Sequence, residues 1–158
     1  MKLKKRRKKE RISKEAIRHS SLGDVRFVKE TGKWRMFGGG HGQENIDELK
    51  KHGIKYKIDK IYPNGVRIGV VPQHKKSPKR KDSNQSWFPS TWTRKTIKRA
   101  GEETINAIPY KLPDGMTTFG KYKNVKVGVK RTNGKVATVF AHKYQSEGKR
   151  KKRSASKF

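Results

Sequence analysis

The sequence contains no cysteine, so disulfides, thiolate metal ligands and a cysteine nucleophile are excluded. It also lacks any apolar run near the roughly 20 residues that a membrane-spanning helix requires. The basic start at Met1–Lys9 is not followed by the apolar segment of a secretory signal. From these absences we expect no membrane association, and export, if it occurs, by some other route.

Acidic residues are scarce. The chain has 13 Asp and Glu against 43 Lys and Arg, which gives a formal net charge of +30. Such a charge opposes compaction and favours a polyanionic partner, most often nucleic acid. The few carboxylates are scattered, with no DxD or HExxH motif, so a metal-dependent nuclease is disfavoured and we expect no cofactor. No P-loop, helix-turn-helix or zinc-finger pattern is present either.

The 158 residues suffice for one domain. Residues 1–11 carry a net charge of +7, and residues 149–158 carry six Lys and Arg and no acid. Blocks of like charge repel one another, so we expect both to be basic disordered tails. The intervening 12–148 forms the predicted folded domain. It retains a charge of +17, so the surface that binds nucleic acid extends beyond the tails.

The polar and apolar pattern predicts an α+β fold. The expected elements are a short helix at 13–18, a hairpin of strands 25–29 and 33–37, a helix at 44–52, a hairpin of strands 54–60 and 66–70, a long loop at 72–90, a helix at 92–107 capped by Ser90 or Thr91, and a meander of strands 117–122, 125–129 and 135–142.

RNA carries its own nucleophile, the 2′-hydroxyl, and can be cut by one base, one acid and a source of positive charge. Histidine suits both proton transfers because it titrates near neutral pH. His41 is the sharpest candidate, since it follows Gly38-Gly39-Gly40 and precedes Gly42. Glycines let the backbone approach a ligand, and the N-terminus of the next helix suits a phosphate. The alternative is an exposed histidine in a flexible loop.

The other four histidines lie in less distinctive sequence contexts. His19 lies at the end of the first predicted helix and is either catalytic or a surface residue beside a turn. His74 lies at the mouth of the long loop, where it either holds a phosphate or belongs to a solvated basic segment. His52 and His142 end a helix and a strand, and neither is given a role.

The last predicted strand places Val136, Thr138, Phe140 and His142 on one face. Thr138 is suited to donate a hydrogen bond to a phosphate or base, and Phe140 either stacks on a base or belongs to the core. The aromatic residues at 86–92 likewise either stack on bases or pack in the hydrophobic core. In a chain that is only 30% hydrophobic, the core is favoured for this cluster.

Taken together, these stretches resemble the bacterial EndoU branch of polymorphic toxins over about residues 19–140. The matching pieces are His19-Ser20, Gly38–Asn45, Asn64–Gly69, His74-Lys75, Gln85–Pro89, Trp92 and Thr138-Val139-Phe140. The last resembles the family's closing Thr/Ser-x-Tyr motif, with Phe140 where many relatives have tyrosine.

The resemblance implies a short N-terminal helix and two small antiparallel sheets with one or two packed helices. It also implies a metal-independent endoribonuclease that leaves 2′,3′-cyclic phosphate and 5′-hydroxyl ends, often beside uridine, with tRNA as one target. His19 and His41 would be base and acid in either order. Thr138 would position phosphate or base, and Lys75, with Lys76 and Lys81 nearby, is the candidate for the family's catalytic lysine. The substrate-binding candidates are His74, Ser86 and Phe140.

Members of this branch act as toxins in bacterial competition. The site of action would be the cytoplasm of the producing cell or, after delivery as a secreted toxin, that of a rival. A cognate immunity protein would be acidic, because it must cover a basic surface. Two other readings stay open on charge alone: a non-catalytic RNA-binding protein of ribosomal type, and a DNA-packaging protein.

Overall fold

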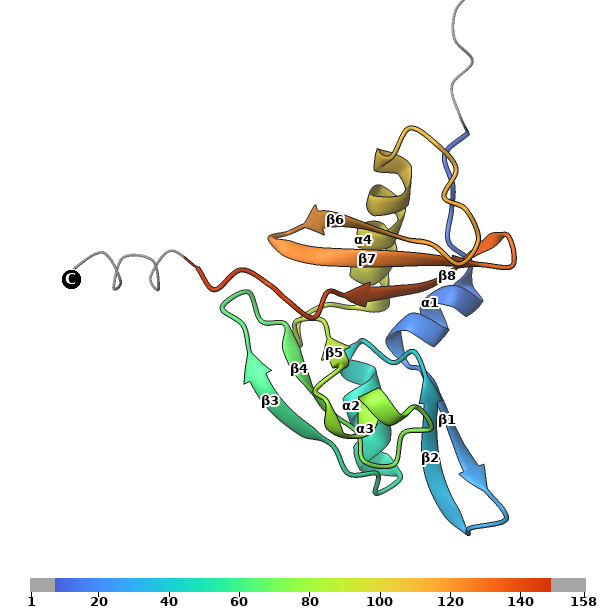
Figure 1. Ribbon diagram of the computed structural model, residues 1–158, viewed down its shortest axis with the longest axis vertical. Helices are drawn as coiled ribbons and strands as arrows, with labels where there is room; N and C mark the ends of the chain where they lie inside the picture. The colour runs from blue at the N-terminus through green and yellow to red at the C-terminus, as the bar shows by residue number, and fades with distance from the viewer. Residues whose placement is uncertain (1–7, 149–158) are drawn as a thin grey trace, which may run out of the picture.

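The computed structural model describes residues 8–148 and has the predicted α+β architecture (Figure 1). Within these residues four helices accompany three small antiparallel sheets of strand order β1-β2, β3-β4-β5 and β6-β7-β8. The elements are α1 (Lys14–Ser21), β1 (Asp24–Val28), β2 (Lys33–Gly38), α2 (Gln43–Lys51), β3 (Lys57–Ile61), β4 (Arg67–Val70), α3 (Ser77–Lys81), β5 (Gln85–Trp87), α4 (Arg94–Ala107), β6 (Thr117–Tyr122), β7 (Val125–Thr132) and β8 (Lys135–Ala141).

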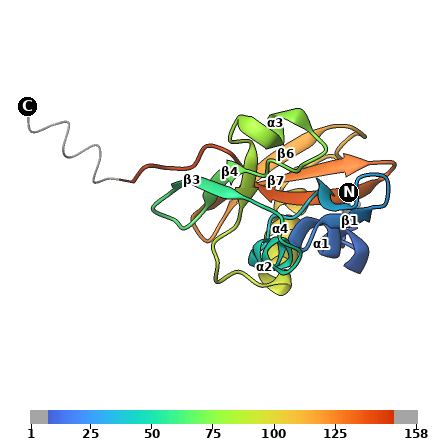
Figure 2. The same ribbon diagram turned by 90° about the horizontal axis from the view of Figure 1, so that it is seen from below.

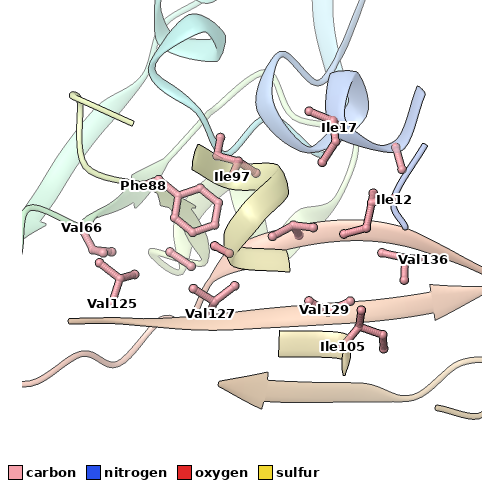
Figure 3. Close-up of a cluster of buried hydrophobic side chains, with 14 of the residues drawn as sticks. Ile12, Ile17, Val66, Phe88, Ile97, Ile105, Val125, Val127, Val129 and Val136 are labelled. Carbon is pink, nitrogen blue, oxygen red and sulfur yellow. The ribbon is translucent and has the colours of Figure 1, made fainter. Parts of the chain in front are cut away.

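The larger core lies where α1 and α4 pack against the β6-β7-β8 sheet. In β7, Val125, Val127 and Val129 share one face and are fully buried, as the pattern predicts. In α4, Ile97 and Ile105 face this sheet at helical spacing (Figure 3). The segment after β5 adds Phe88 and Trp92, whose rings stack at 4.8 Å. The aromatic cluster therefore serves the core, as favoured from the sequence.

A smaller core holds the other half of the molecule together. It consists of buried residues from β2, α2 and β5 and the segments that flank β3 and β4: Met36, Ile46, Leu49, Ile54, Val71 and Trp87. Strand β2 also pairs with the chain after β4, because the Lys75 amide donates to the Met36 carbonyl at 2.8 Å. Seen from below, α3 lies on the opposite side of the sheets from α1 and α2 (Figure 2).

The prediction of a long loop at 72–90 is wrong, because helix α3 and strand β5 lie there and β5 adds a third strand to the β3-β4 sheet. The resemblance implied two small sheets, whereas the described residues form three. Strand β5 has three residues, all buried, so it shows no alternation that a sequence pattern could reveal. The cap of α4 also differs, because it is Thr93, whose side chain accepts from the Thr96 amide, and not Ser90 or Thr91.

A bulge in β8 corrects the predicted face of that strand. Thr138 pairs with Lys130, but Val136 pairs with Arg131, so Ala137 is the extra residue. Val136 therefore turns into the larger core, while Thr138 stays on the opposite face. The expectation that Val136 shares a face with Thr138 is wrong because simple alternation fails at a bulge.

Of the two predicted tails, residues 1–7 and 149–158 lie outside the described residues. Within 8–11, Glu10 pairs with the buried Arg131 guanidinium at 2.6 Å, and its amide donates to Asn106 at 2.8 Å. The chain is therefore attached to α4 and β7 just before α1. Over residues 8–148, no helix has the length and hydropathy needed to cross a bilayer.

Candidate active site

A cleft of about 470 Å³ lies where α1, the β2–α2 loop, α3, β5 and β8 meet. It is lined by most of the residues singled out from the sequence: His19, His41, His74, Ser86, Thr138 and Phe140. Lys75 is not among the lining residues. The structure thus brings together side chains as far apart in the chain as His19 and Phe140, which are separated by 121 positions.

Backbone hydrogen bonds hold the glycine loop against the end of α1. The carbonyls of His19, Ser20 and Ser21 accept from the amides of Gly40, His41 and Gly42 at 2.9, 2.5 and 3.0 Å. These bonds fix the segment of His19 beside that of His41, although a whole hairpin separates them along the chain.

Only glycine fits the centre of this loop. Gly39 and Gly40 have φ of 61° and 72°, which other residues rarely adopt. A Cβ on Gly39 would lie 2.1 Å from the His19 carbonyl oxygen, and one on Gly40 would lie 2.4 Å from Nδ2 of Asn45. The glycines therefore permit the close approach of loop and helix, rather than a flexible loop with an exposed histidine.

His41 is only 5% exposed, and its ring orientation is fixed by β5. Nδ1 lies 2.7 Å from the carbonyl oxygen of Ser86, which can only accept, so Nδ1 carries the hydrogen. Nε2 is left with a free lone pair. Burial, reinforced by the charge of Lys79, lowers the pKa of His41 to about 3. At neutral pH this histidine is therefore an uncharged proton acceptor.

His19 lies in a different electrostatic setting. Its ring packs against the backbone of the glycine loop, since a Cβ on Gly39 would lie 2.9 Å from Nε2. Burial lowers its pKa, but the Asp24 carboxylate opposes the shift, while Lys76 adds to it. Because His19 is less enclosed than His41 and faces a carboxylate, it retains a proton more readily.

His74 is a neutral hydrogen-bond donor. It is 1% exposed, and its Nδ1 accepts from the Lys76 amide at 2.9 Å, so the hydrogen is on Nε2. Burial and the charge of Lys79 lower the pKa of His74 to about 4. Among the described residues, Nε2 has no hydrogen-bond partner. A buried donor without a partner on the wall of a cleft is suited to bind a ligand oxygen.

Four lysines line the cleft, namely Lys76, Lys79, Lys130 and Lys143. Lys79 lies on α3, is partly buried and was missed by the sequence reasoning. Burial, with help from Lys76, lowers the pKa of Lys79 to about 8. Lys75 is exposed, and its ammonium lies 5.8 Å above the Phe37 ring, outside the cleft lining. The missed signal is Ser77-Pro78, which is typical of a helix start and would have placed a short helix in the supposed loop.

The last strand supplies the remaining wall. Thr138 and Phe140 line the cleft, and the Phe140 ring lies 5.9 Å from that of His41. Phe140 lies over Gly128 of β7, where a Cβ would come within 2.4 Å of its Cζ. Ser86 contributes its carbonyl to His41, and its hydroxyl lies 3.3 Å from the same Nδ1. Ser86 thus orients His41.

The cleft combines a proton acceptor, a proton donor and several cations, with Lys76, Lys130 and Lys143 beside Lys79. Such a set can bind a phosphodiester and move protons to and from its oxygens. In residues 8–148, no three or more His, Asp or Glu side chains gather in a way that could hold a metal ion.

Comparison with known proteins gives one family. The family model described as bacterial EndoU nuclease matches residues 13–143, which cover the cleft and nearly all of the described chain. No curated protein and no solved structure matches the chain.

Proposed function

Because the chain belongs to the bacterial EndoU nuclease family, we propose that it is an endoribonuclease that cuts RNA without a metal ion, through attack by the 2′-hydroxyl. The supporting observation is the meeting of His19 and His41 in one basic cleft, where burial lowers the pKa of both rings and the Asp24 carboxylate opposes that shift at His19. Two histidines of this kind supply the base and the acid that the reaction needs.

His41 is the general base in this proposal. Its Nδ1 hydrogen is committed to the Ser86 carbonyl, so Nε2 takes the proton of the 2′-hydroxyl. The 2′-oxygen then bonds to phosphorus. The low pKa of His41 keeps the ring unprotonated before the reaction.

His19 is the general acid. It gives a proton to the 5′-oxygen as the bond from phosphorus to that oxygen breaks, which leaves a 2′,3′-cyclic phosphate and a 5′-hydroxyl. Burial lowers the pKa of His19, the Asp24 carboxylate offsets part of that shift, and the phosphate of a bound substrate would offset more of it.

Lys79 and His74 stabilise the charge that develops on the phosphate. Lys79 offers a partly desolvated ammonium, and His74 offers a neutral N–H without a partner in the described chain. Such donors stabilise a transition state strongly because they are oriented in advance. Lys79 thereby takes the role first considered for Lys75.

Thr138 and Phe140 recognise the nucleotide, by a hydrogen bond to phosphate or base and by stacking. We extend the proposal to cleavage beside uridine, with tRNA as a substrate, and to a toxin role in bacterial competition. A charge of +30 favours an acidic immunity protein as the partner that covers the cleft.

The test is cleavage of total tRNA and of uridine-containing oligoribonucleotides by purified wild-type protein, His19→Ala and His41→Ala. We expect each substitution to lower the cleavage rate by roughly 10²–10⁴, the usual contribution of a positioned acid or base. Circular dichroism and thermal unfolding control for folding. Wild-type rates in both folded variants would contradict the proposal.

The second candidate, a non-catalytic RNA-binding protein, is favoured by the net charge of +30 alone. It predicts RNA binding with no cleavage by the wild type.

A further inference from the structure

A row of aromatic rings leads out of the cleft along β8 and β6. The Phe140 ring lies 6.1 Å from Phe119, Phe119 lies 4.9 Å from His142, and His142 lies 5.9 Å from Tyr144. At its inner end Phe140 lies 5.9 Å from His41. The rings are thus continuous from the candidate base to the surface.

The outer members of this row are unusually exposed for aromatic side chains. Phe119 is 44% exposed and Tyr144 is 66% exposed. Neither belongs to the two buried clusters. Several neighbouring aromatic rings left in water indicate a surface that binds something.

Tyr144 is positioned by its backbone and not by core packing. Its amide donates to Nδ1 of His142 at 2.9 Å, and the next residue, Gln145, accepts from the Lys126 amide at 2.8 Å. Gln145 also donates to the Lys126 carbonyl at 3.0 Å. The segment after β8 is therefore tied to β7, so the row is organised before any ligand arrives.

Cations flank the rings. The Lys126 ammonium lies 5.4 Å from the centre of Phe119, and that of Lys143 lies 5.7 Å from the centre of Tyr144. A groove of about 440 Å³ runs between Phe119 and Tyr144, and its described lining includes Lys121 and Lys126 but no carboxylate. The surface therefore places aromatic rings, which can stack on bases, next to lysines, which can bind phosphates.

We infer that Phe140, Phe119, His142 and Tyr144, here called the aromatic row, bind unpaired nucleotides that flank the scissile phosphate. The inference rests on the proposed function for its substrate, RNA. Single strands fit because their bases are free to stack on side chains, whereas the bases of a duplex are already stacked on each other. The cations favour this occupant over an apolar protein surface.

Two experiments test the aromatic row, using Phe119→Ala and Tyr144→Ala. The first measures affinity for an octanucleotide whose scissile 2′-hydroxyl is replaced by hydrogen, so that it requires no catalysis. Each substitution is expected to weaken binding by about 5-fold to 100-fold, the usual range for one stacked base. Phe27→Ala and Tyr110→Ala, which remove aromatic residues of similar exposure outside the row, serve as matched controls and should bind as wild type.

The second experiment compares kcat/KM for a dinucleotide and an octanucleotide. The Tyr144→Ala variant should lose kcat/KM for the octanucleotide and retain it for the dinucleotide, which is too short to reach Tyr144. Affinity within twofold of wild type in both variants would overturn the inference. If the two variants bound an acidic protein inhibitor more weakly but kept wild-type affinity for the oligonucleotide, the surface would be a protein-binding surface instead. Weakened binding in a protein that cuts nothing would support the row while contradicting the nuclease.

Discussion

At the scale of single residues, the two histidines proposed as base and acid differ in what surrounds each ring. His41 is enclosed and donates to the Ser86 carbonyl, whereas His19 is only partly buried and lies near the Asp24 carboxylate. The sequence offered both residues without an order. The proposed order, with His41 as base and His19 as acid, rests on desolvation and on one hydrogen bond, and neither can be read from spacing along the chain.

This difference predicts the pH dependence of kcat/KM. His41 stays unprotonated down to about pH 3, so protonation of this base does not lower kcat/KM at mildly acidic pH. His19 must carry a proton, and its pKa lies below the ordinary 6.5, so the rate should decline as pH rises through that lowered value.

Asp24→Asn should move this decline to lower pH. Removing the negative charge stabilises the imidazolium of His19 less, so its pKa falls further. Rate profiles from pH 4 to 9 check the shift, with Asp59→Asn, a carboxylate outside the cleft lining, as control. A decline that stays in place, or moves to higher pH, would contradict the assignment of His19 as the acid.

Lys79→Met should lower kcat by roughly 10²–10³, the cost of removing one oriented donor to the transition state. It should also raise Tm at pH 7. The folded state lowers the pKa of Lys79 from 10.5 to about 8, so it disfavours the charged form. The resulting destabilisation is present below about pH 8 and is relieved as pH rises toward 10.5.

The matched variant is Lys75→Met, which removes an exposed lysine four positions away. Its activity should remain near wild type, and its Tm should not rise. Loss of activity in Lys75→Met together with a normal rate in Lys79→Met would return the catalytic role to Lys75.

At the scale of elements, Asn45 connects α1, α2 and β5, which position His19 and His41. It is fully buried at the start of α2, donates to the Leu22 carbonyl at 2.9 Å and accepts from Nε1 of Trp87 at 3.0 Å. These bonds join α2 to the end of α1 and to β5. The same side chain fills the space beside Gly40.

Asn45→Ala should therefore lower the free energy of unfolding by about 2–4 kcal/mol, since it leaves a buried donor and a buried acceptor without partners. Urea denaturation measures this cost. We also expect kcat to fall, because the loop that carries His41 loses its support. A loss under about 0.5 kcal/mol would show that α2 and β5 are held in some other way.

The elements that the sequence revealed share one property, a regular period over several residues. Val127 and Val129 alternate in β7, and Ile97 and Ile105 have helical spacing in α4, so both elements were predicted close to their observed bounds. Strand β5 is too short and too buried to show a period. Helix α3 is short and basic and has no buried apolar face, so only Pro78 marks its start.

Six residues singled out from the sequence lie together in the cleft, whereas two of the elements around them were missed. His19, His41, His74, Ser86, Thr138 and Phe140 all line the cleft, and their residue types and order in the chain had singled them out. Lys79 was not predicted because helix α3, which carries it, was not predicted. The bulge at Ala137 was also invisible, since it arises from strand pairing and not from side-chain pattern.

At the scale of the whole molecule, the cleft joins two cores. His19 comes from α1, which packs on the larger core, while the pairing of β2 with the chain at His74 belongs to the smaller one. The chain around these cores is strongly basic, with a net charge of +30. Long-range attraction therefore brings RNA to the surface, and local geometry selects the phosphate to be cut.

The central claim is that two imidazoles alone move the protons of RNA cleavage. The most direct measurement is the chemistry of the product ends, after cleavage of a uridine-containing oligoribonucleotide in excess EDTA. We predict 2′,3′-cyclic phosphate and 5′-hydroxyl ends, and no cut where the 2′-hydroxyl is replaced by hydrogen. Products with 5′-phosphate ends, cleavage at the deoxy position, or activity lost to EDTA would contradict the account.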